Sequence, residues 1–256
     1  MTDPRAMADT LIAAERTRTP VPPFTRSNPF LSAETSYKAQ QLFVEHRLQD
    51  GEELIGVKLG LTSRVKREAL GIHEPVYGRL TSGMVRAASE PVPLQELIRP
   101  RAEPEIAFVM GPRLVGPVTA AQVIAATEVM VAAVEIMDSR YRERFRLPDS
   151  VADNAGAARI VLGSRQRRPA ELEDLALIGC VFRSRGEVVG TAAGGAVMGD
   201  PAAAVAWLVN NLTARGEHLA AGSIVLSGGL TASVPLVGGD NLTAEFDGLG
   251  SVEVHS

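Results

Sequence analysis

From Gly51 onward the chain consists of short apolar runs separated by glycine and proline, and this pattern constrains the fold more than any other feature of the sequence. Runs of this length between turn residues are typical of β-strands. We expect strands at 54–59, 105–110, 129–137, 176–183 with 188–190 as its hairpin partner, 223–227, 241–246 and 251–254. Few long helical patterns interrupt them and no regular strand–helix alternation is present, so a β-rich mixed α/β fold is predicted.

The helical signals lie mainly in the first 50 residues. A short helical stretch around 6–16 is followed by a proline-rich connector at 19–30, which we expect to be extended. Ser32 has the position of an N-cap for a helix that runs to about Gln49 and ends at Gly51. The stripe expected on this helix consists of Tyr37, Val44 and Leu48, with Gln41 between them.

Two further helices are expected among the strands. Thr119 and Gln122 have the spacing of a capping box, which opens a short helix. Asp200 is an expected N-cap because Pro201 follows it at the first helical position, and Gly216 lies just past the expected end of that helix.

The composition excludes several classes of protein. With 256 residues, of which 45% are hydrophobic and 22% charged, the chain is long enough to bury a large core and is unlike a disordered chain. Its 26 basic and 30 acidic side chains give a net charge of −4 without a Lys/Arg block, which argues against a nucleic-acid or anionic-membrane partner. We expect one catalytic domain over 1–256, with an N-terminal helical segment at 1–50 and a β-rich metal-binding core at 51–256.

Cysteine use and hydropathy narrow the class further. The single cysteine, Cys180, excludes an intrachain disulfide framework and a Cys-rich zinc site, and its apolar neighbours indicate a core residue. No apolar stretch approaches the roughly 18 residues that a membrane-spanning helix needs. The first residues also lack the apolar centre of a signal peptide. We therefore expect a cytoplasmic protein.

The strongest chemical signal is the segment Arg101-Ala-Glu103-Pro-Glu105. Because side chains alternate along an extended strand, Glu103 and Glu105 point to the same face, roughly 6.5–7 Å apart. Neighbouring carboxylates repel each other unless a cation or a proton separates them. The alternative interpretation is a strand end with a solvated acidic edge.

A third carboxylate, Glu135, lies inside the apolar run 129–138. A strand this apolar is expected to be buried on both faces, and an unpaired buried carboxylate is costly. Glu135 must therefore be protonated, paired with an arginine such as Arg101, Arg140 or Arg142, or bound to a metal. The three glutamates have no cysteine or histidine near them in sequence, and an oxygen-only set suits Mg²⁺ or Mn²⁺ rather than Zn²⁺.

Lys58 is one of only three lysines among the 26 basic residues, and it lies in the apolar run 54–59. Such a lysine either snorkels to the surface or remains a buried ammonium with a shifted pKa. In a chain that otherwise uses arginine, the presence of lysine favours the buried ammonium. Gly60, Thr62 and Ser63 follow it and offer backbone N–H and hydroxyl groups to an anion.

Two loop-like segments carry further polar groups. Residues 150–156 include Asp153, and the simplest interpretation of this segment is an Asx turn. Residues 226–231 contain Gly228 and Gly229, which either bring bare backbone close to a ligand or form a bulge. The chain has no G-x-G-x-x-G dinucleotide fingerprint, no G-x-S-x-G elbow and no paired-histidine zinc motif.

These segments, in this order, resemble the 2-oxopent-4-enoate hydratase and 4-oxalocrotonate decarboxylase family of the fumarylacetoacetate hydrolase superfamily. The resemblance runs from about Gly51 to Val254 and rests on the motifs GVKLGLTS, EPVYGRLT, RAEPEIAF, EIMDSRYRERF, VADN, RGEHLAAG, LSGGLTA and FDGLGSV. It implies the rolled β-sheet with flanking helices of a fumarylacetoacetate hydrolase C-terminal domain. It also implies that the chain forms a homo-oligomer.

The resemblance implies roles for the residues at matching positions. Glu103, Glu105 and Glu135 match the carboxylates that bind Mg²⁺ or Mn²⁺, and Lys58 matches the active-site lysine. The expected substrate-binding residues are Leu59 through its backbone, Asp153, Gly228, Gly229, Thr231, Arg140 and Arg142. Relatives often have serine where this chain has Gly156, so a hydroxyl group at that position is missing here.

Two activities are implied. The first is metal-dependent decarboxylation of 2-oxohex-3-enedioate (4-oxalocrotonate) to 2-hydroxypenta-2,4-dienoate through a metal-chelated dienolate. The alternative is hydration of that dienoate (2-oxopent-4-enoate) to 4-hydroxy-2-oxopentanoate. The motifs SGGLTA and DSRYRERF are more similar to the decarboxylase, which must hold a second carboxylate, and we expect Arg140 or Arg142 near the cavity mouth to attract it. Alternating arginines from 140 to 146 are also typical of a solvated strand edge.

A non-enzyme alternative is a degenerate relative that acts as an inactive scaffold for a partner hydratase, since decarboxylases of this family associate with the hydratase. The presence of all three glutamates and of Lys58 favours an active lyase. The expected partners are thus a small 2-oxo or 2-hydroxy alkenoate, further copies of the chain, and a partner hydratase or decarboxylase.

Overall fold

The computed structural model of the chain describes residues 3–70 and 72–256. At its centre is an eight-stranded mixed sheet in the order β2-β1-β9-β4-β5-β6-β3, with β10 paired to β4. Its strands are β1 (Leu54–Gly60), β2 (Val76–Thr81), β3 (Val85–Arg86), β4 (Arg101–Met110), β5 (Thr127–Met137), β6 (Ala157–Leu162), β9 (Ile224–Leu226) and β10 (Val234–Pro235). The β1–β9 and β3–β6 pairs are parallel, and the other pairs are antiparallel.

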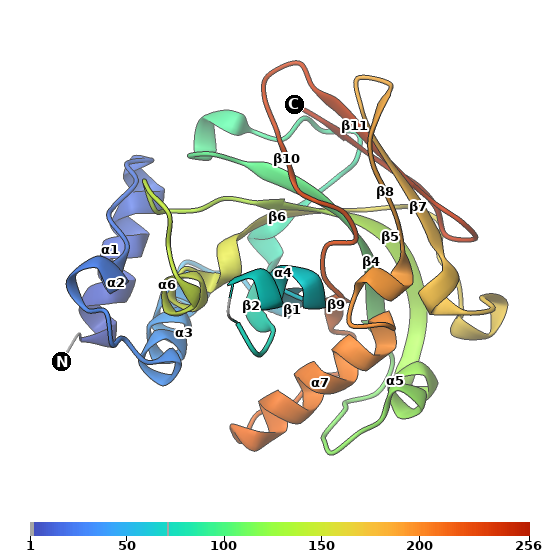
Figure 1. Cartoon of the computed structure of the whole chain (residues 1–256), viewed down its shortest axis with the longest axis horizontal. Coiled ribbons are helices and arrows are strands. Elements are labelled where there is room, and N and C mark those ends of the chain that lie inside the picture. The colour runs from blue at the N-terminus through green and yellow to red at the C-terminus, as the bar shows by residue number, and fades with distance from the viewer. Residues whose placement is uncertain (1–2, 71) are drawn as a thin grey trace.

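A second, four-stranded sheet is antiparallel throughout, in the order β12-β11-β7-β8. Its strands are β7 (Gly179–Ser184), β8 (Glu187–Ala193), β11 (Asn241–Phe246) and β12 (Gly250–His255). Figure 1 shows the long strands β4 and β5 curving through the molecule, with the second sheet against one end of the first. The predicted β-rich mixed fold is confirmed, and β11 has the predicted bounds.

The helices form two groups beside the sheets. One group consists of α1 (Pro4–Thr17), α2 (Phe24–Ser27), α3 (Ala33–Gln49) and α6 (Leu147–Ala152), which pack against one another. The other consists of α5 (Ala120–Ala126) and α7 (Pro201–Ala214), which lie together at the opposite side in Figure 1, and α4 (Arg64–Leu70) follows β1. The predicted capping box at Thr119 and N-cap at Asp200 are both confirmed.

The main apolar core lies between the two sheets and α7. Phe108 of β4, Phe182 of β7, Leu242 of β11 and Leu208 of α7 are all fully buried in it. Burial of each such side chain contributes about 1.5–3 kcal/mol. This packing supports the pairing of β4 with β5, the two strands that carry Glu103, Glu105 and Glu135.

A second apolar cluster attaches the N-terminal helices to the segment that follows β5. Met7 and Leu11 of α1 and Phe43 of α3 pack with Tyr141, and all four side chains are buried. The helix α1 is thereby held against the chain just beyond Glu135. This contact places α1 beside the segment that connects β5 to α6.

Two expectations for the N-terminal segment are wrong in part. The connector 19–30 is not extended throughout, because α2 forms a helical turn in which Thr25 bonds the Asp149 carboxylate. The buried face of α3 consists of Ser36, Ala39, Gln40, Phe43 and Val44, whereas Gln41 and Leu48 of the expected stripe are exposed. Packing of α3 between α1 and α6 selects this face, which its own weak apolar periodicity did not reveal.

Some strand bounds also differ from those expected. β4 begins at Arg101, earlier than predicted, so all of Arg101–Met110 is extended. β7 begins only at Gly179, because Leu175–Leu177 forms a 3₁₀ turn. The strands β2 and β6 were not expected, since Arg79 and Arg159 interrupt their apolar patterns.

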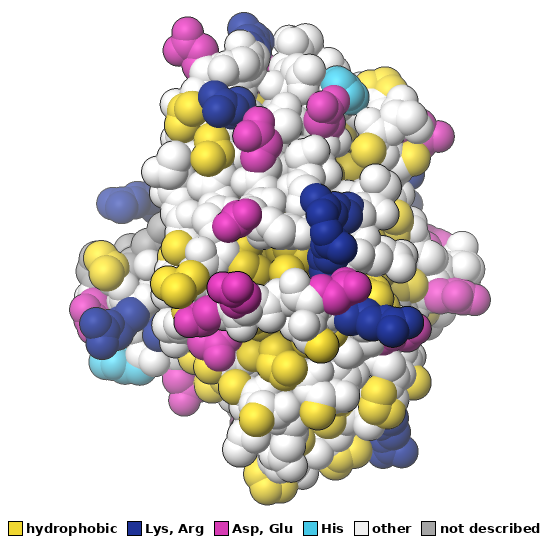
Figure 2. Space-filling view, turned by 90° about the vertical axis from the view of Figure 1, so that its right-hand side faces the viewer, with side chains coloured by type: hydrophobic (Ala, Val, Ile, Leu, Met, Phe, Trp, Pro, Cys, Tyr) yellow, Lys and Arg dark blue, Asp and Glu magenta, His cyan; other side chains and the backbone are white. Residues whose placement is uncertain are grey.

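The surface carries no large block of one charge on the face drawn in Figure 2, where acidic and basic side chains lie among one another with apolar groups between them. Within the described part of the chain, none of the helices combines the length and apolar character required to cross a bilayer.

Candidate metal centre and active site

Three glutamates from two neighbouring strands converge at the centre of the large sheet. Glu103 and Glu105 lie on the same face of β4, as strand alternation predicts, and Glu103 stands opposite Glu135 in the antiparallel pairing with β5. One carboxylate oxygen of each residue lies within 4.8 Å of the others. Residues 30 positions apart in sequence thus form one cluster because β4 and β5 are paired in this register.

The burial of this cluster is what makes it unusual. Glu105 and Glu135 are completely buried, and Glu105 Oε1 and Glu135 Oε1 have no hydrogen-bond partner within the described residues. Burial, and next the neighbouring charge of Glu135, raise the pKa of Glu105 well above its usual value. Buried carboxylate oxygens without partners are costly, so the cluster fits a hard divalent cation that prefers oxygen ligands.

Lys58 of β1 provides a positive charge beside these carboxylates. Its Nζ lies 2.9 Å from Glu135 Oε2 and donates a hydrogen bond of 3.0 Å to the Ala155 carbonyl oxygen. The side chain is a buried ammonium, not a snorkelling one, since only 1% of the residue is exposed. Burial alone would lower the pKa of Lys58, but the Glu135, Glu105 and Glu103 carboxylates raise it above its ordinary value, so the group stays charged.

The carbonyl that accepts from Lys58 belongs to a strained turn. Asn154, Ala155 and Gly156 all have φ between 51° and 74°, the left-handed region that non-glycine residues seldom adopt. Asn154 holds this turn in place, because its side chain accepts from Arg79 N at 2.7 Å and donates to Arg79 O at 2.9 Å. Backbone strain of this kind is often found at functional sites.

Two glycines after β9 allow the backbone to approach the glutamates. The Gly228 N–H donates to Glu105 Oε2 at 2.7 Å, and its φ of 117° requires glycine. A Cβ atom at Gly229 would lie 2.0 Å from Glu103 Oε2, so a side chain there would displace that carboxylate. The bare backbone of this segment thus lies close to Glu103 and Glu105, and its contact with a ligand stays a prediction.

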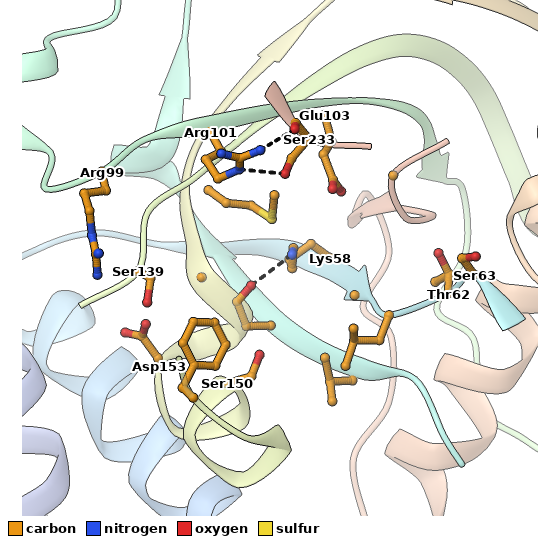
Figure 3. Close-up of a pocket in the computed structure, with 18 residues that line it drawn as sticks. Lys58, Thr62, Ser63, Arg99, Arg101, Glu103, Ser139, Ser150, Asp153 and Ser233 are labelled. Carbon is orange, nitrogen blue, oxygen red and sulfur yellow. Dashed lines mark hydrogen bonds between the residues drawn. The ribbon is translucent and has the colours of Figure 1, made fainter. Parts of the chain in front are cut away.

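A cavity of about 320 Å³ opens beside this cluster. Its ionisable lining groups are Lys58, Arg99, Arg101, Glu103 and Asp153; Val76, Met137 and Phe145 supply apolar surface, and Ser63, Ser139, Ser150 and Ser233 supply hydroxyl groups. Figure 3 shows Lys58 in the middle of the cavity, with Thr62 and Ser63 at one side and Arg99, Ser139 and Asp153 at the other. The cavity therefore brings cationic side chains, a glutamate of the cluster, hydroxyl groups and apolar surface together.

The arginines of the cavity are not the ones expected. Arg99 and Arg101 line it, and Arg101 is held by hydrogen bonds from Nε to Ser233 Oγ at 2.8 Å and from Nη2 to the Ser233 carbonyl. Neither Arg140 nor Arg142 is among the lining residues. Strand alternation could have found Arg101, since it lies two residues before Glu103 on the same face of β4.

The expected position of Arg140 at the cavity mouth is therefore corrected. Its side chain is fully buried. Its Nη2 donates a hydrogen bond of 2.8 Å to Glu15 Oε1 of α1, and its Nε lies 3.4 Å from Asp153 Oδ1. The position of Arg142 is corrected as well, because this residue is exposed outside the cavity and its carbonyl accepts from Arg99 Nη1 at 3.3 Å.

Of the remaining expected substrate-binding residues, some line the cavity and others do not. Asp153, Gly229 and also Gly156 line the cavity, whereas Leu59, Gly228 and Thr231 are not among its lining residues. Leu59 is fully buried in the main core, although its neighbours Lys58 and Gly60 line the cavity. Thr231 is 8% exposed and packs closely on Gly190 of the second sheet.

The family model of the fumarylacetoacetate (FAA) hydrolase C-terminal domain matches residues 62–255. The chain belongs to this family. The predicted rolled sheet with flanking helices is thereby confirmed as the FAA hydrolase C-terminal fold, and α1 to β1 precede the matched region.

Individual members of the FAA hydrolase family are similar to nearly the whole chain. A 4-oxalocrotonate decarboxylase of Pseudomonas sp. (strain CF600) is 39% identical over 96% of this chain and 94% of its own. A 2-keto-4-pentenoate hydratase of Paraburkholderia phymatum is 38% identical over 96% of this chain and 95% of its own. These relatives confirm the expectation of an enzyme of the lyase class.

A solved structure agrees with the sheet and helices described here. The 4-oxalocrotonate decarboxylase from Pseudomonas putida G7, complexed with magnesium and adipate, superposes with a TM-score of 0.95 at 36% identity. The match covers 98% of this chain and 96% of that one. Members of the FAA hydrolase family with this fold thus include one that binds a divalent cation and a dicarboxylate.

Proposed function

We propose that this lyase decarboxylates 2-oxohex-3-enedioate to 2-hydroxypenta-2,4-dienoate with the help of a divalent cation. The observation that carries the proposal is that one cavity contains both a carboxylate from the glutamate cluster and two arginines, Arg99 and Arg101. A substrate with an oxo acid at one end and a second carboxylate at the other matches this distribution of charge. The adipate complex of the similar decarboxylase supports a dicarboxylate ligand.

Glu103, Glu105 and Glu135 would hold the cation. When bound, it supplies Lewis-acid polarisation of the substrate's oxo group and a fixed orientation for the adjacent carboxylate. The all-oxygen set of carboxylates supports Mg²⁺ or Mn²⁺. Magnesium in the similar decarboxylase supports the same choice.

Lys58 contributes a second source of positive charge. Loss of CO₂ leaves an electron pair that moves along the conjugated chain to the oxygen on C2, so negative charge grows there. The ammonium of Lys58 is fixed by Glu135 and the Ala155 carbonyl, so it is preorganised to stabilise that charge as a hydrogen-bond donor and to donate a proton to the same oxygen. The neighbouring carboxylates raise the pKa of Lys58, which favours the charged ammonium.

Arg99 and Arg101 would attract the carboxylate that is lost. Both residues are exposed at the edge of the cavity, so their charge is partly screened by water. A weak contact suits a decarboxylase, because a tight clamp on this carboxylate would stabilise the substrate more than the transition state. The apolar groups Val76, Met137 and Phe145 exclude water from the carbon chain between the two ends.

The second candidate is the hydratase, which would add water to 2-hydroxypenta-2,4-dienoate and give 4-hydroxy-2-oxopentanoate. The observation that favours it is that relatives named as hydratases match this chain at 38% identity, close to the decarboxylases. The inactive scaffold is disfavoured because Lys58 and the glutamates keep a connected, buried arrangement. A single catalytic domain, a homo-oligomer, a partner hydratase and a cytoplasmic location remain part of the proposal.

The deciding experiment supplies the two compounds separately to the purified chain with Mg²⁺ and identifies the products. We expect CO₂ and 2-hydroxypenta-2,4-dienoate from 2-oxohex-3-enedioate. If that compound stays intact while the dienoate becomes 4-hydroxy-2-oxopentanoate, the hydratase takes the place of the decarboxylase. Metal binding with no turnover of either compound would support the inactive scaffold instead.

A further inference from the structure

A line of ionisable side chains connects the N-terminal helix to the wall of the cavity. Arg140, which is fully buried, donates from Nη2 to Glu15 Oε1 of α1 at 2.8 Å. On its other side, Arg140 Nε lies 3.4 Å from Asp153 Oδ1, and the Arg140 backbone N–H donates to Asp153 Oδ2 at 3.0 Å. Asp153 lines the cavity, so α1 reaches the site through two charged contacts.

The guanidinium between the two carboxylates has a fixed position. Its Nη1 donates to the Asp138 carbonyl at 2.7 Å and its Nη2 also donates to the Ala157 carbonyl at 3.2 Å. The ring of Phe43 lies 5.1 Å from it. Because these contacts hold Arg140 in place, the fold fixes the distances from its guanidinium to the carboxylates of Glu15 and Asp153.

Asp153 receives the weaker share of that charge. Only 2% of it is exposed, and its Oδ1 has no hydrogen-bond partner within the described residues. Glu15, in contrast, accepts hydrogen bonds from both Arg140 and Arg47 at 2.8 and 2.6 Å. Two carboxylates therefore share one buried guanidinium, and the less well paired of them is the one beside the cavity.

The groups around Asp153 favour its neutral form. Burial, the largest cause, raises the pKa of Asp153 to about 7, and the Glu15 and Asp138 carboxylates add to the rise while Arg140 opposes it. Tyr141 also faces this group, but it stays neutral, because its hydroxyl donates to the Asp149 carbonyl and burial raises its pKa. A protonated carboxyl is an O–H donor, and an ionised one would repel an anionic ligand.

We propose that Asp153 is protonated in the resting site and donates a hydrogen bond to the outer carboxylate of a dicarboxylate ligand, and that Glu15 of α1 is the positioning residue that keeps it protonated by holding the charge of Arg140. This inference rests on the proposed function for its choice of ligand. Asp153, Ser139 and Arg99 share one side of the cavity in Figure 3, so a neutral donor and a cation would bind the same carboxylate. The proton stays on Asp153, and no covalent step is involved.

The test measures binding and needs no turnover. Adipate, a dicarboxylate that cannot react, is titrated by calorimetry into the full chain with saturating Mg²⁺ between about pH 5.5 and about pH 8.5. For the wild-type chain we expect the affinity to fall about tenfold or more as the pH rises through about 7, because the proton on Asp153 is lost. In Asp153→Asn, which keeps a neutral donor, that part of the pH dependence should disappear.

The positioning role is tested with a matched pair of variants. Glu15→Gln removes an anion and leaves more of the Arg140 charge to Asp153, so the fall in affinity should move to lower pH. Glu52→Gln is the control, because Glu52 also pairs with Arg47, at 3.1 Å, whereas the carboxylates that pair with Arg140 among the described residues are Glu15 and Asp153. Its curve should match that of the wild-type chain.

Three results would overturn the inference: no adipate binding at about pH 6, an unchanged pH dependence in Asp153→Asn, or equal curves for Glu15→Gln and Glu52→Gln. The first two remain decisive even if Glu15→Gln fails to fold. The outcome is separable from the proposed function. A chain that binds adipate with the expected pH dependence but leaves 2-oxohex-3-enedioate intact would contradict the decarboxylase and leave the role of Asp153 standing.

Discussion

Lys58 and Glu135 form an ion pair in which both side chains are almost completely buried, with Nζ 2.9 Å from Oε2. The two residues come from strands that are not neighbours, since β9 and β4 lie between β1 and β5 in the sheet. Desolvation of such a pair often cancels its Coulomb energy, so it is weak evidence for a role in stability. Lys58 lines the cavity and contacts Glu135 of the glutamate cluster, which supports the catalytic role that we propose for it.

The proposed catalytic role of Lys58 predicts that the conservative substitution Lys58→Arg lowers kcat strongly. Lys58→Arg keeps the charge but replaces a compact ammonium with a larger, planar guanidinium at a position where the side chains of Lys58 and Glu135 are almost completely buried. We expect kcat to fall about 100-fold or more, the loss seen when one preorganised donor is removed. Lys38→Arg is the control, because Lys38 is exposed and pairs with Glu34 at the surface. Activity within a few-fold of wild type in Lys58→Arg would exclude a catalytic role.

The proposed metal site predicts that substitutions in the glutamate cluster selectively weaken metal binding. In Glu105→Gln and Glu135→Gln a neutral amide replaces a buried ligand, and we expect the affinity for Mg²⁺ or Mn²⁺ by calorimetry to fall by more than about 100-fold. Glu128→Gln is the matched control, since Glu128 lies on β5 as well but is exposed. Chelation should abolish activity, and Mg²⁺ should restore it better than Zn²⁺. Unaltered affinity in both cluster variants would contradict the site.

The cavity arginines predict a change in substrate binding. Arg101→Gln should raise KM for 2-oxohex-3-enedioate about tenfold or more with a smaller change in kcat, because a weak, partly screened contact that attracts the outer carboxylate of the substrate is lost. Arg142→Gln is the control, since Arg142 lies outside the cavity. Steady-state kinetics on both variants distinguishes the two positions. Equal KM values would mean that Arg101 does not hold the substrate.

Gly229 predicts a steric effect on the metal centre. In Gly229→Ser the new Cβ would lie 2.0 Å from Glu103 Oε2, so the carboxylate must move. We expect the affinity for Mg²⁺ to fall about tenfold while the fold persists. Gly238→Ser is the control, because a Cβ there meets nothing within 4 Å. A crystal structure of Gly229→Ser with Glu103 undisplaced would refute this coupling.

Asp153 predicts how stability depends on pH. Its pKa is raised to about 7 in the folded chain against an ordinary value of 3.8. Between these values the unfolded chain loses the proton and the folded chain retains it, so the free energy of unfolding should fall as the pH rises from about 4 to about 7 and then level off. The fall is at most about 4 kcal/mol. Urea unfolding of Asp153→Asn should show a smaller fall than the wild-type chain, and parallel curves would contradict the shift.

Much of the site could be predicted because its signals are local. The alternation of Arg101–Met110 put Glu103 and Glu105 on one face, and the apolar neighbours of Glu135 and Lys58 indicated that both are buried. The helix ends at Thr119 and Asp200 were also local, since a cap needs only its own first turn. Strands interrupted by arginine, such as β2 and β6, were missed because their burial depends on neighbours distant in sequence.

The sequence by itself determined the strand-rich fold and the oxygen-only set of glutamates, because period-two alternation and apolar context act over a few residues. Only the tertiary structure decided which arginine meets which carboxylate. The chain turns inward after β5, so Arg140 meets Glu15 of α1 and Asp153, while Arg99 and Arg101 face the cavity. A buried charge selects the partner that packing brings to it, and Glu15 lies 125 residues from Arg140, a separation that no local pattern encodes.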